Sequence, residues 1–477
     1  MAKTDKKLVE YRHAAGEAVN VLGGFELPED IRKKIPVKLI ERFNAGVNAR
    51  VCDMRDQWLI EYPLSSMILL TFIAVLCGAD NWIEIENFCR TKSEWLKKFI
   101  PLPNGRTPCN DTFRRVFHMI DQEEFKRMSV EFIVTSLDDM KRGLGMKLPA
   151  GQRKVYCIDG KQEKGTGRLA GTDREIRDQQ TLHIYEPERG ICVISKRIDI
   201  KKNEIPVAQY LLSQNKDMIK GSIFTADSLH TQYPTVQLIR QNGGDYVFGL
   251  KGNQSSLKND VERVFTEEKK AELRKYSSRF FAAVEIAHNQ IEIREYYMFT
   301  DVDELPANQP KEKWLGLAAV MAVDKKCISL VTDEISSETR YYISSLNEIE
   351  LFASCIRLHW GVEEQHFFQD TVFHQDDNQT VDENSFQNLA EIKRMCLTLL
   401  KIYAVLEGTS VSQTRKNIGW NPETHLPRLL GFYDAETLEK ALTAGQTAPK
   451  EKPKKKNVKY QTYLAQQAQA GKEGVQQ

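Results

Sequence analysis

The sequence predicts an α/β protein in which an all-helical N-terminal domain precedes a mixed sheet with helices on both faces. Two changes of pattern lead to this prediction. Apolar residues recur at helical spacing from Glu29 to about Leu148, and at Lys154 they give way to short apolar runs of strand length. Further strand patterns occupy about 276–346 before helical spacing resumes at Ile349. With 477 residues, the chain is long enough for about three domains.

The overall charge is close to neutral, with 67 Lys and Arg residues against 66 Asp and Glu residues and a net charge of +1. A chain with this balance has no general attraction to polyanions, so any nucleic-acid surface must be local. The nine cysteines are scattered singly without a Cys-x-x-Cys pair, which argues against a zinc site and fits a reducing cytosol. The longest apolar run, Met67 to Ala79, is shorter than the roughly 20 residues of a membrane span and predicts a buried helix.

The N-terminal region consists of helical patterns separated by short breaks. Residues 1 to about 28 are charged and have no clear period, so we expect a partly ordered arm. The helices predicted after this arm are Ile31 to Ala45, Pro63 to Gly78, Trp82 to Phe99, Phe113 to Ile120 and Glu123 to Asp139. Asn110 and Asp111 supply capping residues for the fourth of them. We therefore predict a helical domain of residues 1–148.

The order of elements after Lys154 predicts a ribonuclease-H-like domain. Three strands come first, and a helix, a strand, a helix, a strand and a helix follow. The predicted strands are Val155 to Ile158, Thr181 to Tyr185, Ile191 to Ile200, Ser222 to Ala226 and Asp245 to Leu250, and the helices are Pro206 to Gln214, Thr235 to Asn242 and Ser255 to Lys270. In such a sheet the first and fourth strands are neighbours.

A β-rich insertion of about 276–346 separates this series from the helices that follow. Its predicted strands are Phe280 to Ala287, Gln290 to Phe299, Trp314 to Val323, Cys327 to Thr332 and Arg340 to Ser344. Helical spacing runs on from Ile349 and, after a polar loop, from Phe386 to Tyr403. We predict a catalytic domain of residues 149–405, then a C-terminal region of residues 406–477 with short helices and a disordered basic tail at Lys450 to Lys456.

Three carboxylates occupy matching places in this predicted topology. Asp159 ends the first strand of the domain, Asp227 ends the fourth, and Glu363 lies in the helical segment that begins at Ile349. Taken singly, Asp159 before Gly160 is a common turn pair and Asp227 could cap the next helix. Because the two strands are predicted neighbours and the helix can pack over the same end of the sheet, we expect the three side chains to converge.

Converging carboxylates repel one another unless a cation lies between them. The usual solution is a hard divalent cation with oxygen ligands, Mg²⁺ or Mn²⁺. Two such ions about 3.5 to 4 Å apart can activate an attacking oxygen and stabilise the leaving oxygen of a phosphodiester. The sequence therefore predicts phosphoryl transfer on a nucleic-acid backbone. His366 and Asp370 share a helix face with Glu363, where a structural role is the alternative to a site near the metals.

Basic residues beside the predicted strand ends are candidates for contact with DNA phosphates. Lys161 follows Asp159, and Lys251 follows the fifth strand; an ordinary surface lysine is the alternative for each. Arg114 and Arg115, in the middle of the N-terminal helices, could contact phosphates or form a solvated helix face.

Many stretches of the chain carry a resemblance to a known family. They are Tyr62-Pro-Leu64, Ala74-Val-Leu-Cys-Gly-Ala-Asp80, Pro101-Leu-Pro-Asn-Gly105, Asp111-Thr-Phe-Arg-Arg-Val-Phe117, Ile158-Asp-Gly-Lys161, Lys202-Asn-Glu-Ile205, Thr225-Ala-Asp-Ser-Leu-His-Thr-Gln232, Asp245-Tyr-Val247, Leu250-Lys-Gly-Asn-Gln254, Arg340-Tyr-Tyr-Ile-Ser-Ser345 and Arg357-Leu-His-Trp-Gly-Val-Glu363. In this order they resemble the DDE transposases of bacterial insertion sequences, in the ISAs-type or H-repeat-associated branch. The resemblance covers about Tyr62 to Tyr403, and the family's catalytic triad falls on Asp159, Asp227 and Glu363.

The resemblance implies metal-dependent cleavage at the ends of the element and transfer of the released 3′ hydroxyl into target DNA. Some relatives carry Tyr, Arg and Lys around the glutamate, and the Arg and Lys hold DNA phosphates. This chain has Ile356, His359 and Asp370 at those spacings. The nearby Arg357, and Lys393 or Arg394, could supply positive charge instead, and His359 is a further candidate for a DNA contact.

The leading hypothesis is a DNA transposase that binds the terminal inverted repeats of its element through the N-terminal helices. Its predicted partners are double-stranded DNA, as element ends and as target, and a second copy of the chain on the paired ends, with no membrane. The predicted location is the cytoplasm, at the nucleoid when DNA is bound. Two alternatives stay open: a domesticated DNA-binding protein without transposition activity, and a repair or restriction nuclease of the same fold.

Overall fold

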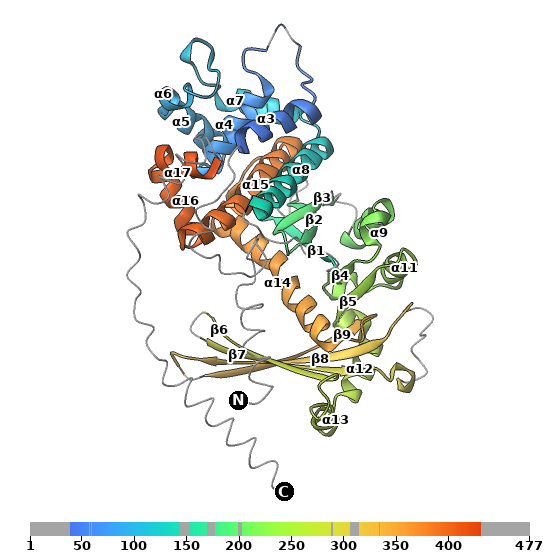
Figure 1. Cartoon of the computed structure of the whole chain (residues 1–477). Coiled ribbons are helices and arrows are strands. Elements are labelled where there is room, and N and C mark those ends of the chain that lie inside the picture. Colours follow the sequence, from blue (N-terminus) through green and yellow to red (C-terminus); the bar gives the residue numbers. More distant parts are fainter. Residues whose placement is uncertain are drawn as a thin grey trace.

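The computed structural model describes residues 39–56, 58, 60–143, 153–168, 177–198, 203–287, 290–305, 314–332 and 334–430. Within these ranges the chain forms a helical part and a long mixed sheet flanked by helices, and the helix α14 joins the two (Figure 1). The predicted N-terminal arm and the basic tail from Lys450 to Lys456 lie outside the described residues.

The helical part gathers elements from both ends of the described chain. Its helices are α3 (Leu39–Arg50), α4 (Leu64–Leu76), α5 (Trp82–Thr91), α6 (Ser93–Leu96), α7 (Asn110–Met119), α8 (Gln122–Gly143), α15 (Glu383–Glu407), α16 (Val411–Trp420) and α17 (Pro422–Leu430), with the 3₁₀ turn η2 (Pro103–Gly105). The single helix predicted for Trp82 to Phe99 is wrong, because α5 ends at Thr91 and the short α6 follows. The predicted domain boundaries near residues 148 and 405 stay predictions.

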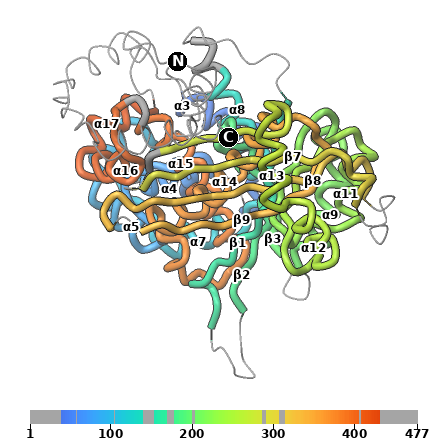
Figure 2. The backbone as a smooth tube through the Cα atoms, turned by 90° about the horizontal axis from the view of Figure 1, so that it is seen from below, coloured from blue at the N-terminus to red at the C-terminus, as the bar shows by residue number. Residues whose placement is uncertain are grey.

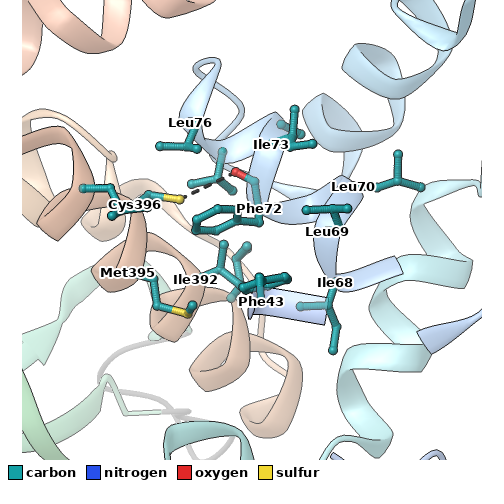
Figure 3. Close-up of a cluster of buried hydrophobic side chains, with 14 of the residues drawn as sticks. Phe43, Ile68, Leu69, Leu70, Phe72, Ile73, Leu76, Ile392, Met395 and Cys396 are labelled. Atoms are coloured by element: carbon teal, nitrogen blue, oxygen red, sulfur yellow. Dashed lines mark hydrogen bonds between the residues drawn. The ribbon is translucent and has the colours of Figure 1, made fainter. Parts of the chain in front are cut away.

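The core of the helical part forms around α4. Nearly every residue of α4 is buried, which confirms the prediction that the apolar run from Met67 forms a buried helix. Phe43 of α3 stacks on Phe72 at a centroid distance of 5.0 Å. Ile392 and Cys396 of α15 also approach α4, and the Cys396 thiol donates to the carbonyl oxygen of Phe72 (Figure 3). The chain thus returns to its N-terminal helices after completing the sheet.

The sheet has nine strands in the order β3-β2-β1-β4-β5-β9-β8-β7-β6. They are β1 (Val155–Glu163), β2 (Gln179–Glu186), β3 (Ile191–Ile198), β4 (Ile223–Ala226), β5 (Asp245–Leu250), β6 (Phe280–Ala287), β7 (Gln290–Phe299), β8 (Ala319–Ser329) and β9 (Ile335–Ser344). The pairs β1–β4 and β4–β5 are parallel and the other pairs are antiparallel. The prediction that the first and fourth strands are neighbours is confirmed.

The β-rich insertion continues this same sheet, because β9 pairs with β5 through Phe248 and Ile343. One prediction within it is wrong: the two strands expected at 314–323 and 327–332 are the single strand β8. The polar residues from Asp324 to Lys326 suggested a turn between them. They instead continue the ladder, in which Lys325 lies opposite Arg294 of β7 and Glu338 of β9.

Helices cover both faces of the sheet because side chains alternate between the faces of each strand. The first face packs against the helices that connect successive strands from β3 to β6, and its core includes Ile158 and Phe224. Those helices are α9 (Glu204–Gln214), α10 (Lys216–Ile219), α11 (Tyr233–Gln241), α12 (Ser255–Val264) and α13 (Glu267–Leu273). On the second face, Cys157 and Val247 share a core with α14 (Ile349–Thr371). Figure 2 shows β7, β8 and β9 side by side where α14 crosses them.

Candidate active site

Two neighbouring parallel strands present Asp159 and Asp227 at the same edge of the sheet. Ile158 of β1 lies opposite Ala226 of β4, and an aspartate follows each of them. Asp227 directly follows β4, as predicted, but the prediction that Asp159 ends its strand is wrong, because β1 continues to Glu163 beside β2. The β1 residues before Asp159 are buried, and partial exposure begins at Asp159 itself. Asp227 accepts a hydrogen bond from the backbone N–H of Leu229 at 3.0 Å and so caps the 3₁₀ turn η4 (Ser228–His230). The predicted cap and the predicted convergence with Asp159 are therefore compatible.

Glu363 is carried to this edge by α14, and polar contacts fix the helix against the two strands. Thr225 of β4 shares a hydrogen bond of 2.9 Å with Nδ1 of His359. The Cys157 thiol of β1 donates to the carbonyl oxygen of Leu358 at 3.6 Å. These contacts lie two residues before each aspartate and one helical turn before Glu363, which is exposed. The helix is thus held in register with the strand ends.

The acidic groups at this edge act on one another electrostatically. Burial, together with repulsion from Asp227, Glu204 and Glu363, raises the pKa of Asp159 to about 7. Partial desolvation also raises the pKa of Glu363, against the attraction of the Arg340 and Lys251 side chains. Asp159 therefore lies in a strongly negative field.

Oxygen donors in such a field suit a hard divalent cation. Among the residues that the structure describes, no three acidic, histidine or cysteine side chains are close enough together to enclose a metal ion as they stand. The donor chemistry at this edge of the sheet therefore fits Mg²⁺ or Mn²⁺, while coordination would require the carboxylates to move toward one another.

His366 lies against Asp159 from the helix side. Its Nδ1 is 3.4 Å from Oδ2 of Asp159, and its ring packs on that of His183 at a centroid distance of 5.2 Å. Burial lowers the pKa of His366 to about 3, so the ring is neutral near pH 7. His366 therefore lies beside Asp159 at the candidate site as an uncharged side chain.

Three of the predicted DNA contacts are committed to the protein interior. Lys161 is buried, and its ammonium donates to Asp370 at 2.6 Å. Arg357 donates to Glu285 at 3.2 Å, and His359 is held by Thr225. The basic alternatives Lys393 and Arg394 are also buried; Lys393 donates to the carbonyl oxygen of Phe373, and Arg394 pairs with Glu391. Lys161, Lys393 and Arg394 therefore do not present their charge to solvent, whereas Arg357 and His359 are partly exposed.

The other basic predictions are exposed. Lys251 follows β5 and lies near enough to Glu363 to affect its pKa. Arg114 and Arg115 lie on α7 in the helical part, where both donate to Asp111 (Figure 1). The structure brings only the first of these toward the three carboxylates.

Sequence reasoning missed four residues around Glu363 and Asp159: Arg340, Trp360, Lys325 and Glu204. Arg340 of β9 lies near Glu363, and its guanidinium carbon is 5.5 Å from the ring centroid of Trp360. Lys325 is also 5.5 Å from that centroid. Glu204 begins α9 and interacts with Asp159. Arg340, Trp360 and Glu204 all fall in stretches that carry the family resemblance, which was the available signal.

The comparison with protein families identifies the class of protein. A model described as the transposase DDE domain matches residues 150–399, more than half of the chain, and a DDE_Tnp_1-associated model matches residues 48–133. The chain belongs to the DDE transposase family. The family generally uses divalent metal ions, and transposases act on DNA. No helix in the described part of the chain is long and apolar enough to cross a membrane.

Particular relatives place the chain in the H-repeat-associated branch. It is 30% identical over 355 residues to the "H repeat-associated putative transposase YhhI" of Escherichia coli K12. The match covers 73% of this chain and 87% of that protein. It is also 31% identical over 353 residues to YbfL of the same strain, with the same shares covered. A structural match to the cryo-EM structure of a piggyBac transposase synaptic complex with hairpin DNA covers 90% of this chain and 84% of the matched chain. At a TM-score of 0.34 and 12% identity, this likeness carries no argument.

Proposed function

We propose that this chain is an active DNA transposase that cuts the ends of an insertion sequence and joins them to target DNA. Asp159, Asp227 and Glu363 are its catalytic residues. The observation that carries the proposal is their placement: the two aspartates directly follow the last parallel pair of β1 and β4, and the glutamate lies on a helix that is hydrogen-bonded to both strands. Turn formation or helix capping alone does not require such a convergence.

The proposed catalytic domain has a ribonuclease-H-like fold. The strand order β3-β2-β1-β4-β5, with β2 antiparallel to the other four strands, supports this assignment. So do helices between the parallel strands and a final helix, α14, across the opposite face. In open α/β sheets, reactive groups collect beyond the carboxyl ends of the parallel strands, which is where Asp159 and Asp227 lie.

The proposed cofactor is a pair of Mg²⁺ or Mn²⁺ ions held by these three carboxylates. When bound, the ions would activate the attacking oxygen and stabilise the leaving oxygen of the phosphodiester. The chain's own contribution is to hold the acids in place. His359 and Leu358 fix the helix to the strands, and the neutral His366 packs beside Asp159 without neutralising its charge.

DNA is the proposed partner, and exposed cations beside the carboxylates are suited to its phosphates. Lys251 and Arg340 flank Glu363, and Arg114 and Arg115 are exposed on α7 of the helical part, which we propose binds the terminal inverted repeats. The proposed assembly is a homodimer on paired ends, at the bacterial nucleoid. The rival function is a domesticated DNA-binding protein, which would bind the same DNA without cutting it.

The test is cleavage and strand transfer on a duplex that carries the inverted repeat flanking the gene. Asp159→Asn, Asp227→Asn and Glu363→Gln should each reduce Mg²⁺-dependent cleavage by about a thousandfold or more and leave DNA binding intact. Glu364→Gln is the matched control, because this neighbour on α14 faces Lys401 at 3.9 Å and should keep cleavage near wild type.

Each outcome of this test separates one alternative. Full cleavage by any of the three triad variants would refute the assignment of that residue. Wild-type protein that binds the duplex without cutting it would establish the domesticated alternative, and cleavage without strand transfer would indicate a nuclease.

A further inference from the structure

A fourth carboxylate, Glu204, lies at the same edge of the sheet. Asn203 caps α9 by accepting a hydrogen bond from the Ile205 N–H at 3.2 Å, and Glu204 is the first residue of the helix. Its carboxylate occupies the space beside Gly160, so that a Cβ atom at that position would overlap it. Gly160 directly follows Asp159, and the helix α9 packs beside η4, which directly follows Asp227. Glu204 therefore reaches the two aspartates from the helical layer opposite α14.

The charge on Glu204 acts on the candidate site. Repulsion from Glu204 raises the pKa of Asp159 by more than repulsion from Glu363 does, although Glu363 belongs to the proposed triad. A negative group that acts on Asp159 in this way adds to the field that a divalent metal ion would neutralise.

A buried histidine points at the same carboxylate. His230 of η4 is fully buried, and its Nε2 lies 3.4 Å from Oε2 of Glu204. Neither ring nitrogen has a hydrogen-bond partner among the described residues. Buried polar nitrogens are usually satisfied, so the contact with Glu204 is the one that a small movement would complete. His230 thus provides a means of holding Glu204 by one oxygen beside Gly160, the residue that follows Asp159.

We propose that Glu204 is a fourth acidic residue of the active site and supplies an oxygen ligand to the divalent cation held by Asp159. The inference rests on the proposed function, and it adds a ligand from α9 to the three from β1, β4 and α14. The alternative role is structural, since an acidic residue in the first turn of a helix is stabilised by the helix dipole. A metal ligand and a helix-stabilising residue differ in what their removal changes.

The first measurement is Mn²⁺ binding to the full chain, followed by electron paramagnetic resonance without DNA. Glu204→Gln should weaken Mn²⁺ binding by about tenfold or more, with little change in the melting temperature of the metal-free protein. Glu268→Gln is the matched control, because Glu268 occupies the first turn of α13 and is exposed. Wild-type Mn²⁺ affinity in Glu204→Gln would overturn the inference.

A second variant displaces Glu204 without removing its charge. In Gly160→Ala the new methyl group must push the Glu204 carboxylate away from Asp159, so Mn²⁺ affinity should fall as in Glu204→Gln. In a Glu204→Ala background the space is free, and Gly160→Ala should cost no further affinity. An equal loss of affinity from Gly160→Ala in both backgrounds would show that the glycine matters for another reason and would contradict the inference.

Asp159→Asn distinguishes failure of this inference from failure of the proposed function. If Asp159→Asn loses Mn²⁺ affinity and cleavage while Glu204→Gln keeps both, the inference is wrong and the proposed function stands. If wild-type protein neither binds Mn²⁺ nor cuts DNA, the proposed function and the inference that rests on it fail together.

Discussion

Two groups of carboxylates surround two positions of β1, one group around Asp159 and the other around Lys161. They differ in the charge of the side chain that the acids face. Around Asp159, the acids Asp227, Glu204 and Glu363 each repel its carboxylate, and no lysine or arginine of the described residues is paired with it. Around Lys161, the acids Glu163, Asp370 and Asp376 surround a buried ammonium at distances of 3.9, 2.6 and 3.6 Å. We call these groups the Asp159 cluster and the Lys161 cluster.

The difference shows how one strand supports both chemistry and structure. In the Lys161 cluster, a permanent cation joins β1 to α14 and to the 3₁₀ turn η7 (Gln375–Asp377), so its ion pairs hold the fold together. In the Asp159 cluster, we propose that an exchangeable divalent ion supplies the balancing charge. Paired acids stabilise the folded chain, whereas unpaired acids cost stability and gain function from a metal.

The first prediction compares the two clusters by the change in unfolding free energy when Lys161 or Asp159 is replaced. Lys161→Met leaves three acids around an apolar side chain and should lower the free energy of unfolding by about 3 to 5 kcal/mol. Asp159→Asn removes a mutually repelling acid and should cause no loss, with a gain on the order of 1 kcal/mol in metal-free buffer at pH 8. Urea unfolding of the three proteins measures both effects.

A second substitution tests the cause of the loss at Lys161. Asp370 is the acid nearest to the ammonium, so Asp370→Asn in the Lys161→Met background should recover part of the lost stability. If the double variant is less stable than Lys161→Met alone, uncompensated charge is not the reason for the loss. A drop in stability for Asp159→Asn as large as that for Lys161→Met would remove the proposed distinction between the clusters.

The second prediction concerns Glu163 of the Lys161 cluster and the pH dependence of stability that it causes. Glu163 is buried and is the acid farthest from the ammonium, and burial raises its pKa to about 7 despite the attraction of Lys161. The folded state therefore binds a proton here that the unfolded state releases at lower pH. The stability from this group is fully present below the unfolded pKa and is lost as the pH rises through about 7.

The corresponding measurement compares wild type with Glu163→Gln at pH 5 and pH 8. Between these values, wild type should lose up to about 3 kcal/mol more of its unfolding free energy than the variant. The variant keeps a neutral group at the position, so the contribution of residue 163 does not change with pH. Equal pH dependence in both proteins would show that Glu163 is ionised throughout.

The sequence predicted the strands of the Asp159 cluster because they are short, buried apolar runs with polar ends. Val155 to Ile158 and Ser222 to Ala226 each lead to an aspartate, and the order of elements made them neighbours. The single strand β8 was missed because its polar residues from Asp324 to Lys326 interrupt the apolar pattern, although they continue the ladder with β7 and β9. The continuity of the insertion with the main sheet depends on the pairing of β5 with β9, which local patterns do not encode.

The residues that the sequence misplaced are those whose partners are distant along the chain. Nothing near Lys161 indicates that Asp370 and Asp376 reach it from more than 200 positions away, so it was expected to face DNA. Glu204 was missed for the opposite reason. An acid in the first turn of a helix has a sufficient local explanation, and only its contact with Gly160 connects it to the site.

The third and smallest prediction concerns the cations of the two clusters. Lys251 is exposed and Arg340 is partly exposed beside Glu363, whereas the ammonium of Lys161 is buried among acids. Only exposed cations can release counterions from DNA when the protein binds. Lys251→Gln and Arg340→Gln should therefore each lower the slope of log affinity against log salt concentration by about 1.

The measurement is fluorescence anisotropy with a labelled duplex at a series of salt concentrations. Lys269→Gln is the control, because this lysine is on α13, pairs with Glu272 at 3.0 Å and should leave the slope unchanged. An unchanged slope for both Lys251→Gln and Arg340→Gln would show that the DNA backbone does not pass beside Glu363. The exposed cations would then serve only to moderate the charge of Glu363, as Lys161 does for the acids around it.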